Sequence, residues 1–424
     1  MKKSIELKWR KLDNTAKIFP IISNKNFSSV FRLSCVLSEN IQKEMLYDAL
    51  IQTLETFKVF KVKLKKGFFW YYFESNLKSP IIEEEHTYPC KNINTRKNNN
   101  YLFKVTYYKN KINLEIFHSI TDGNGAIIFF KAIIYKYLDL KYNLKFNLKD
   151  KDKLNLNIDD GYLKKYKKTK SNNLNLKRAY SLKGKLLPLY AISVIHGHIN
   201  LEDLKRVCKA KNVTITEYLT TVLLYSLYKG NFLKSKSKLP IKIYIPVNLR
   251  KILDFSTLSN FFSYISVERN FKKMPYSTFE DLLEYVKNEF STKLITNKLN
   301  DKISSNVSAE KNLFIRIIPL FIKKIGIKLG YMQASKHHTS TLSNIGIIDI
   351  DKNYEKYIKN FLFLIAPTKA EKIKCSVCSF KDDLTFTFTS CLNDTTVEKI
   401  FFTTLLNNNI NLYIESNGVY NEKM

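Results

Sequence analysis

Six consecutive residues, His118-Ser119-Ile120-Thr121-Asp122-Gly123, contain the side chains best suited to chemistry in this chain. A histidine serves as a general base when one ring nitrogen is free to accept a proton and the other is held by a partner. Asp122 lies four residues further on, so it can stabilise the loop or pair with a cation without touching the imidazole. Gly123 and Gly125 permit a tight turn and a close approach by a substrate. The segment therefore predicts proton abstraction by His118.

A purely structural interpretation of the same residues has to be weighed against this one. His118 could be an ordinary polar residue that ends a strand, and Asp122 an ordinary helix cap. A single short motif matches many unrelated sequences by chance. The spacing alone favours the structural interpretation, so the rest of the chain has to decide.

The elements around the segment are of a kind that would hold it rigidly. An apolar strand is expected over 112–117, directly before His118, and a helix over 125–138 that is apolar nearly all round and therefore buried. A rigid strand end, a turn and a packed helix together form a suitable setting for a catalytic side chain.

The spacing of apolar residues predicts the remaining elements. Strands are expected over 27–37, 59–73, 101–108, 191–199, 241–246, 261–267, 343–350, 360–364 and, as a hairpin, 374–391. Helices are expected over 42–57 (capped by Asn40), 201–210, 214–228 (capped by Thr214), 278–296, 310–329 and 394–406. Strands and helices are mixed without strict βαβ alternation, which predicts an α+β fold.

Length and composition predict two domains. The 424 residues exceed what one core usually organises, and a hydrophobic content of 45% is ample for two cores. The stretch 141–177 is crowded with Lys, Asn and Asp and has few apolar anchors, so we expect an exposed linker there. The predicted halves are therefore residues 1–175 and 176–424.

The net charge of +32, from 70 Lys and Arg against 38 Asp and Glu, permits two explanations. An anionic partner such as nucleic acid or a membrane would be attracted by this excess. Lys far outnumbers Arg, however, and Asn, Ile, Phe and Tyr are abundant, as expected of a chain encoded by an A/T-rich genome. Because Arg makes the bidentate contacts to bases and phosphates, no specific nucleic-acid partner is predicted.

The cysteines and the apolar stretches bear on location and metal binding. Six scattered Cys and no signal-like start predict reduced thiols in the cytoplasm. Cys375 and Cys378 have the spacing of half a zinc site, but no second pair completes it and both lie in an expected strand, so no metal is predicted. The stretch 313–329 is broken by charges and a proline, so it cannot span a bilayer. We expect it to form a helix that covers the core, with a position on a membrane surface as the alternative.

Four blocks of sequence, in order along the chain, carry a resemblance to a known family. They are 11–20 (Lys-Leu-Asp-Asn-Thr-Ala-Lys-Ile-Phe-Pro), the His118–Gly123 segment, 246–250 (Pro-Val-Asn-Leu-Arg) continued by 260–262 (Asn-Phe-Phe), and 342–346 (Leu-Ser-Asn-Ile-Gly). The chain resembles the chloramphenicol acetyltransferase-like superfamily and, within it, the alcohol acetyltransferase-like proteins. Together the blocks reverse the preference for the structural interpretation of His118.

The resemblance implies two chloramphenicol acetyltransferase-like mixed-sheet subdomains with an active-site tunnel between them. An acyl-CoA, with acetyl-CoA as the expected donor, would enter from one face and a small-molecule alcohol or amine from the other. His118 would deprotonate the acceptor, and no covalent acyl-enzyme or bound cofactor would be needed. Asp122 would be structural and paired with an arginine, Arg250 being the first candidate and Arg10 the second. Ser343 and Asn344 would offer donors to the oxyanion, although each could equally be an ordinary strand-end residue.

Departures from the family's other branches narrow the implied activity. Phe117 precedes His118, where condensation domains usually carry a second histidine, so peptide-bond formation is not expected. The Asp-Phe-Gly-Trp-Gly block of the plant enzymes is absent. His337 and His338 lack a following Asp-Gly and are interpreted as loop residues. Two halves in one chain could supply the tunnel, so a monomer suffices, and a non-catalytic member of the fold or a basic membrane- or nucleic-acid-binding protein stays the alternative.

Overall fold

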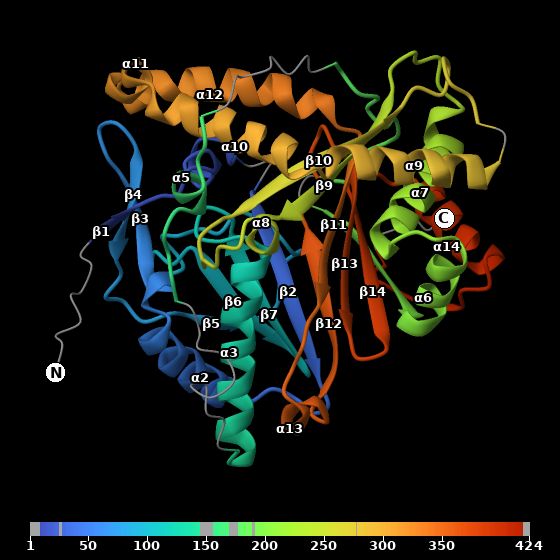
Figure 1. The fold of residues 1–424 in the computed structure, drawn as a ribbon. Helices are drawn as coiled ribbons and strands as arrows, with labels where there is room; N and C mark the ends of the chain where they lie inside the picture. Colours follow the sequence, from blue (N-terminus) through green and yellow to red (C-terminus); the bar gives the residue numbers. More distant parts are fainter. Residues whose placement is uncertain are drawn as a thin grey trace.

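The computed structural model describes residues 9–24, 28–144, 156–168, 177–188, 191–276 and 278–418. Parts of three predictions lie outside these residues: the signal-free start, Phe27 at the start of the first expected strand, and most of the 141–177 linker. The described residues mix helices and strands in several sheets (Figure 1), so the predicted α+β class is confirmed.

The first half of the chain supplies all of the smallest sheet and four of the five strands of another. Its elements are β1 (Trp9–Lys11), α1 (Phe19–Ile22), β2 (Val30–Leu37), α2 (Lys43–Thr56), η1 (Lys58–Phe60), β3 (Val62–Lys66), β4 (Tyr71–Ser75), β5 (Ile82–Glu84), β6 (Phe103–Tyr108), β7 (Lys111–Phe117), α3 (Gly123–Tyr142) and α5 (Gly161–Lys164).

The second half supplies the largest sheet and most of the helices. Its elements are β8 (Ser193–Asn200), α6 (Leu201–Ala210), α7 (Ile215–Leu227), η2 (Tyr228–Phe232), β9 (Ile241–Asn248), α8 (Leu249–Ile252), β10 (Phe262–Arg269), α9 (Phe279–Lys293), α10 (Thr296–Lys311), α11 (Leu313–Ile317), α12 (Leu320–Ala334), η3 (Ser335–His337), β11 (Ser340–Ile347), α13 (Lys352–Glu355), β12 (Ile358–Ile365), β13 (Ile373–Phe380), β14 (Asp383–Ser390), α14 (Thr396–Asn407) and β15 (Leu412–Ser416).

Two large sheets face each other, and one strand joins the halves. The first sheet has the order β12-β2-β7-β6-β5 and the second β10-β9-β11-β13-β14-β8-β15, while β1-β4-β3 form a small third sheet. β12 belongs to the second half of the chain, yet it pairs antiparallel with β2 of the first half. The division of the chain into halves at 175/176 stays a prediction. In the fold, β12 from the second half completes the first sheet.

α3 carries the predicted motif at its start and anchors it in the first core. Its apolar residues, among them Phe129, Phe130 and Ile133, are buried against the first sheet and α2, as the all-round apolar pattern predicts. β7 leads into the motif from the sheet side, so its last residue and the first residue of α3 are both fixed by core packing.

Three expected elements differ from those in the structure. The strand expected over 59–73 is the hairpin β3–β4, which turns at Gly67. Asn40 does not cap α2, whose N-cap position is held by Gln42. The helix expected over 310–329 is two helices, α11 and α12, because Pro319 takes an extended conformation at the N-cap of α12. A helix that was not predicted, α10, precedes them. Its buried apolar residues, Leu299, Ile303 and Val307, are separated by polar residues, which makes the helical pattern weak.

The cysteine pair of β13 behaves as its strand position predicts. Cys375 packs in the core of the second sheet and Cys378 in the core of the first, because residues three apart on a strand face opposite sides. Burial raises the pKa of both thiols. Among the described residues, no cluster of three or more His, Cys, Asp and Glu could hold a metal ion.

Candidate active site

His118 lies at the end of β7, beside a cavity of about 420 Å³ between the two large sheets. Its backbone N–H donates to the carbonyl oxygen of Ser29 (2.9 Å), which ties the histidine to the residue directly before β2. The cavity walls come from both halves of the chain, and they include Gly123 at the start of α3 and Ser343 on β11. Residues of all four sequence blocks therefore line one cavity.

Three aromatic rings hold the imidazole of His118. Phe19 stacks on it with ring centroids 4.5 Å apart, and Phe31 and Phe262 contact it at 5.1 and 5.5 Å. Burial lowers the pKa of His118 below its ordinary value, although the nearby Asp122 carboxylate opposes the shift. The imidazole is therefore neutral at pH 7, which is the form that a general base requires.

A chain of hydrogen bonds selects the tautomer of this neutral imidazole. Nδ1 of His118 lies 3.0 Å from Oδ1 of Asn260. The Asn260 amide is itself oriented, because its Nδ2 donates to Oδ2 of Asp13 (3.0 Å). An amide oxygen can only accept, so Nδ1 carries the proton and Nε2 is left as the basic nitrogen.

Asp13 is the anchor of that chain. Its two carboxylate oxygens accept from the backbone N–H groups of Ala16 (2.8 Å) and Asn260 (3.2 Å), besides the Asn260 side chain. Burial raises the pKa of Asp13 to about 7, and the hydrogen bonds donated to it oppose this rise. The block 11–20 and the block 260–262 of the sequence therefore meet behind His118.

We predict that Asn260→Ala lowers kcat of the acyl transfer that the resemblance implies by roughly tenfold to hundredfold, as happens when the hydrogen-bond partner that orients a metal-binding histidine is lost. The variant frees the tautomer of His118 without removing the imidazole. The kcat loss should therefore exceed any change in KM, and steady-state kinetics at pH 7.5 would measure both. A variant in which only KM changes would contradict the positioning role of Asn260.

Asp122 and Arg250 form a buried bidentate ion pair. Arg250 Nη1 lies 2.9 Å from Oδ2 of Asp122, and Nη2 lies 3.0 Å from Oδ1. The same carboxylate accepts from the backbone N–H groups of Gly125 (3.1 Å) and Phe261 (2.9 Å). Burial alone would raise the pKa of Asp122, but the Arg250 guanidinium and these hydrogen bonds hold it below its ordinary value. Asp122 thus caps α3 and joins it to the segment after α8.

Arg10, the second arginine considered for Asp122, has other partners. Its Nη2 donates to the carbonyl oxygen of Val59 (3.0 Å), and its guanidinium lies over the ring of Phe73. Arg250 instead donates further hydrogen bonds to the carbonyl oxygens of Thr257 and Ser259. Arg250 is therefore the residue that connects the motif to the loop between α8 and β10.

The two glycines of the motif allow close backbone contacts. A Cβ atom at Gly125 would lie 2.6 Å from the carbonyl oxygen of Leu258 and 2.1 Å from Oγ1 of Thr121. A Cβ at Gly123 would lie 3.2 Å from the side chain of Ile345 on β11. The absence of both side chains lets the start of α3 approach the second half of the chain.

Ser343 and Asn344 lie on β11 beside the cavity but differ in how their polar groups are used. Nδ2 of Asn344 donates to Oγ1 of Thr216 (3.1 Å), and its Oδ1 accepts from the backbone N–H of Gly346 (2.8 Å). Both polar atoms of the Asn344 amide are therefore already hydrogen-bonded within the protein. Ser343, which is buried in the cavity wall, is the better of the two candidates for an oxyanion donor.

A polar cluster that the sequence does not reveal lines another part of the cavity. Glu371 accepts from Oγ1 of Thr341 (2.6 Å) and pairs with Nζ of Lys374 (3.1 Å). His338 packs edge-on against Tyr244, and burial lowers its pKa to about 4. His338 does follow a short turn, as interpreted, but it is also a cavity residue. No spacing signal joins these residues, because they come from separate strands and loops.

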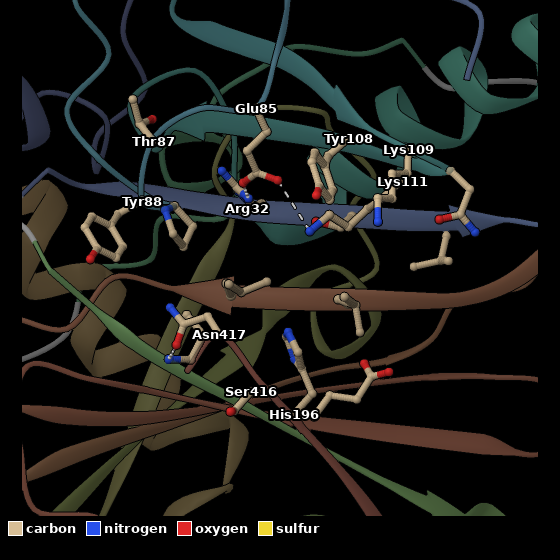
Figure 2. Close-up of a pocket in the computed structure, with 18 of the residues that line it drawn as sticks. Arg32, Glu85, Thr87, Tyr88, Tyr108, Lys109, Lys111, His196, Ser416 and Asn417 are labelled. Atoms are coloured by element: carbon tan, nitrogen blue, oxygen red, sulfur yellow. Dashed lines mark hydrogen bonds and ion pairs between the residues drawn. The ribbon is translucent and has the colours of Figure 1, made fainter. Parts of the chain in front are cut away.

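A second cavity, of about 1090 Å³, lies further along the gap between the two sheets (Figure 2). Arg32 and Glu85 lie on the side of the first sheet, and His196 faces them from β8. Arg32 forms an ion pair with Glu85 and another with Glu115 (2.8 Å). Its charge is therefore balanced within the wall.

A family model described as alcohol acetyltransferase matches residues 164–410, which is more than half of the 424 residues. The chain belongs to the alcohol acetyltransferase family. It is accordingly an acyltransferase, as predicted, and the matched range begins after His118, so the family assignment is independent of that motif.

Solved structures establish the fold of this alcohol acetyltransferase family member. TRI101 from F. sporotrichioides, complexed with coenzyme A and T-2, has a TM-score of 0.65 at 11% identity, covering 97% of this chain and 100% of that one. The trichothecene 15-O-acetyltransferase TRI3 from Fusarium sporotrichioides has a TM-score of 0.60 at 11% identity, covering 95% and 94%. Polyketide synthase associated protein 5 from Mycobacterium tuberculosis has a TM-score of 0.61 at 11% identity, covering 94% and 97%. No curated protein matches the sequence. The predicted chloramphenicol acetyltransferase-like fold is confirmed.

Proposed function

We propose that this family member transfers an acyl group from acyl-CoA directly to the hydroxyl of a small-molecule acceptor, with His118 as the general base. The observation that carries the proposal is the hydrogen bond between Nδ1 of His118 and Asn260. It leaves Nε2 of a neutral imidazole as the proton acceptor beside a cavity that both halves of the chain line.

The proposed reaction balances without a covalent enzyme intermediate. Nε2 of His118 takes the proton of the acceptor hydroxyl while the hydroxyl oxygen attacks the thioester carbonyl carbon. The tetrahedral intermediate then expels the thiolate of coenzyme A, which takes the proton back from His118. An ester and free coenzyme A result, and His118 returns to its neutral form.

The oxyanion of that intermediate needs a donor in the cavity. We assign this role to the hydroxyl of Ser343, because Asn344 is already bound to Thr216. A single oxyanion donor contributes about 2.7–4 kcal/mol in enzymes where it has been removed. Asp122 and Arg250 lie outside this role and hold the loop that presents His118.

Acyl-CoA is proposed as donor on the strength of the family and of the fold shared with TRI101, which was solved with coenzyme A. We propose further that the chain acts as a monomer, since residues of both halves line one cavity. A cytoplasmic location would suit the cysteines of the described residues, all of which are free thiols.

The experiment that tests the proposal is a thiol-release screen with acetyl-CoA against a panel of alcohols, with amines of matched size as controls. Coenzyme A and the ester should appear in equal amounts, and only when acceptor and protein are both present. Release of coenzyme A without any ester, or transfer to amines alone, would overturn the proposal.

A further inference from the structure

The helices α11 and α12 carry most of their large apolar side chains on the outside of the molecule. We propose that this face docks the protein on an anionic lipid bilayer. α11 and α12 lie at the upper edge of the molecule in Figure 1, above the two large sheets. The helix expected over 313–329 was predicted to cover the core, and this prediction is wrong, because most of its large apolar side chains are exposed.

The orientation of α12 is the reverse of that of an ordinary surface helix. Phe321, Ile325 and Leu329 follow one another at intervals of four residues, so they share one face. Their exposed fractions are 63%, 62% and 58%. Met332 continues the same face and Ile322 adjoins it, both exposed. An amphipathic helix in a soluble protein buries such a stripe.

The buried side of α12 explains why the helix cannot simply turn over. Lys323 is buried, and its Nζ donates to the carbonyl oxygens of Phe69 (3.2 Å) and Arg316 (3.1 Å). The same ammonium lies 4.2 Å from the centre of the Trp70 ring. These contacts fix the helix with its lysine inward and its apolar stripe outward.

The apolar surface extends beyond α12 on both neighbouring elements. Phe314 on α11 is 78% exposed. The β3–β4 hairpin presents Phe68, also exposed, and the backbone N–H of Leu320 donates to the Phe68 carbonyl oxygen (2.8 Å), which joins the hairpin to α12. Large contiguous apolar surfaces of this kind mark membrane or protein interaction sites.

Charge favours an anionic membrane as the occupant. Between Glu310 and Asp349 the sequence has six Lys and Arg residues and no Asp or Glu. Lys324 and Lys328 flank the apolar stripe, where their ammonium groups can reach lipid phosphates while their stems lie on the apolar surface. A second copy would bring the same positive charges face to face, and protein interfaces are depleted of lysine. The net charge of +32 adds a long-range attraction to anionic lipid.

One end of α12 connects this face to the active site. Tyr331, Ala334 and Ser335 at that end line the 420 Å³ cavity beside His118. A protein docked through α12 would therefore hold this end of the cavity close to the lipid surface. The docking itself does not depend on acyl transfer, so the two proposals can fail separately.

The test is co-sedimentation of the full chain with vesicles of equal parts phosphatidylcholine and phosphatidylglycerol, compared with phosphatidylcholine alone. The triple variant Phe321→Ser, Ile325→Ser, Leu329→Ser should bind the anionic vesicles at least about tenfold more weakly than the wild type, because it removes three large apolar side chains from the contact. The matched control replaces three exposed leucines elsewhere, Leu77→Ser, Leu233→Ser and Leu406→Ser, and should bind as the wild type does.

Thermal melting would verify that both triple variants are folded, which is expected because all six positions are exposed. Binding by the wild type should weaken as salt is added. Failure of the wild type to bind anionic vesicles would overturn the proposal, as would equal losses in the two variants. The proposal would also be overturned if the wild type did not bind vesicles but formed a dimer that the triple variant at Phe321, Ile325 and Leu329 could not form. The occupant of the apolar face would then be a second copy of the chain.

Discussion

Asp122→Ala is expected to lower the free energy of unfolding by about 3–5 kcal/mol, the usual result of removing one partner from a buried ion pair. The substitution leaves the Arg250 guanidinium without its counterion and removes an acceptor from the N–H groups of Gly125 and Phe261. Acyl transfer should fall with stability, because the start of α3 and the loop after α8 are held together by this carboxylate. Denaturant unfolding of the wild type and the variant would measure the difference.

A matched control is an ion pair on the surface. Asp203 pairs with Arg206 on α6, three residues apart, and the arginine is largely exposed. Asp203→Ala should change the free energy of unfolding by less than about 1 kcal/mol, as exposed pairs do. Equal effects of Asp122→Ala and Asp203→Ala would contradict the structural role of Asp122.

His118→Ala is expected to lower kcat/KM of acyl transfer by about 10²–10⁴-fold, the contribution of a positioned general base. The substitution removes the imidazole that the Asp13–Asn260 pair orients. It also leaves a space beside Phe19 and Phe31, which added imidazole in solution could enter. Thiol release would measure the loss, and partial rescue by imidazole would separate missing chemistry from misfolding.

Two outcomes would contradict the assignment of His118. One is a His118→Ala variant that keeps activity within about tenfold of the wild type, which is less than the loss expected for a base. The other is an inactive variant that has also lost its cooperative thermal transition, together with a folded His118→Gln variant that retains full activity. The second outcome would place His118 in packing and leave the reaction to another group.

Local patterns in the sequence predict the elements around the site well. The apolar run before His118 and the all-round apolar helix after it correspond to β7 and α3, because both are decided by burial of consecutive residues. The cap predicted at Thr214 is present at the start of α7, where it forms a capping box with Glu217. Over 59–73 the apolar pattern fits one long strand as well as a hairpin. The prediction of a continuous strand therefore missed the turn at Gly67.

Contacts between residues far apart in the chain could be predicted only in part. Asp122 and Arg250 are 128 residues apart, and only the resemblance to the family suggested their pairing. Asn260 is 142 residues from His118, and its contact with the imidazole was not predicted, although it lies in a block that the resemblance marked. The sheet order that places β12 beside β2 leaves no trace in spacing or hydropathy.

The prediction that the helix over 313–329 covers the core is wrong for a physical reason. Helical periodicity reveals that one face is apolar, but it does not reveal which face the protein covers. The general rule that apolar faces are buried predicts a buried stripe on α12, whereas the stripe of Phe321, Ile325 and Leu329 is exposed. Its inward lysine is satisfied by backbone carbonyls of the hairpin and of α11, and such partners are invisible in the local sequence.

His118 is proposed to be a neutral base with the proton on Nδ1 and a free Nε2. This protonation state can be measured without knowing the acceptor, by long-range ¹H–¹⁵N correlation of the imidazole nitrogens in histidine-labelled protein, with the His118 signals assigned by their absence in His118→Gln. Because burial lowers the pKa of His118, the neutral Nδ1–H form should persist at pH 7 and gain a proton only as the pH falls below 6.5. A proton on Nε2 in the neutral ring, or an imidazolium at pH 7, would rule out His118 as the base proposed above.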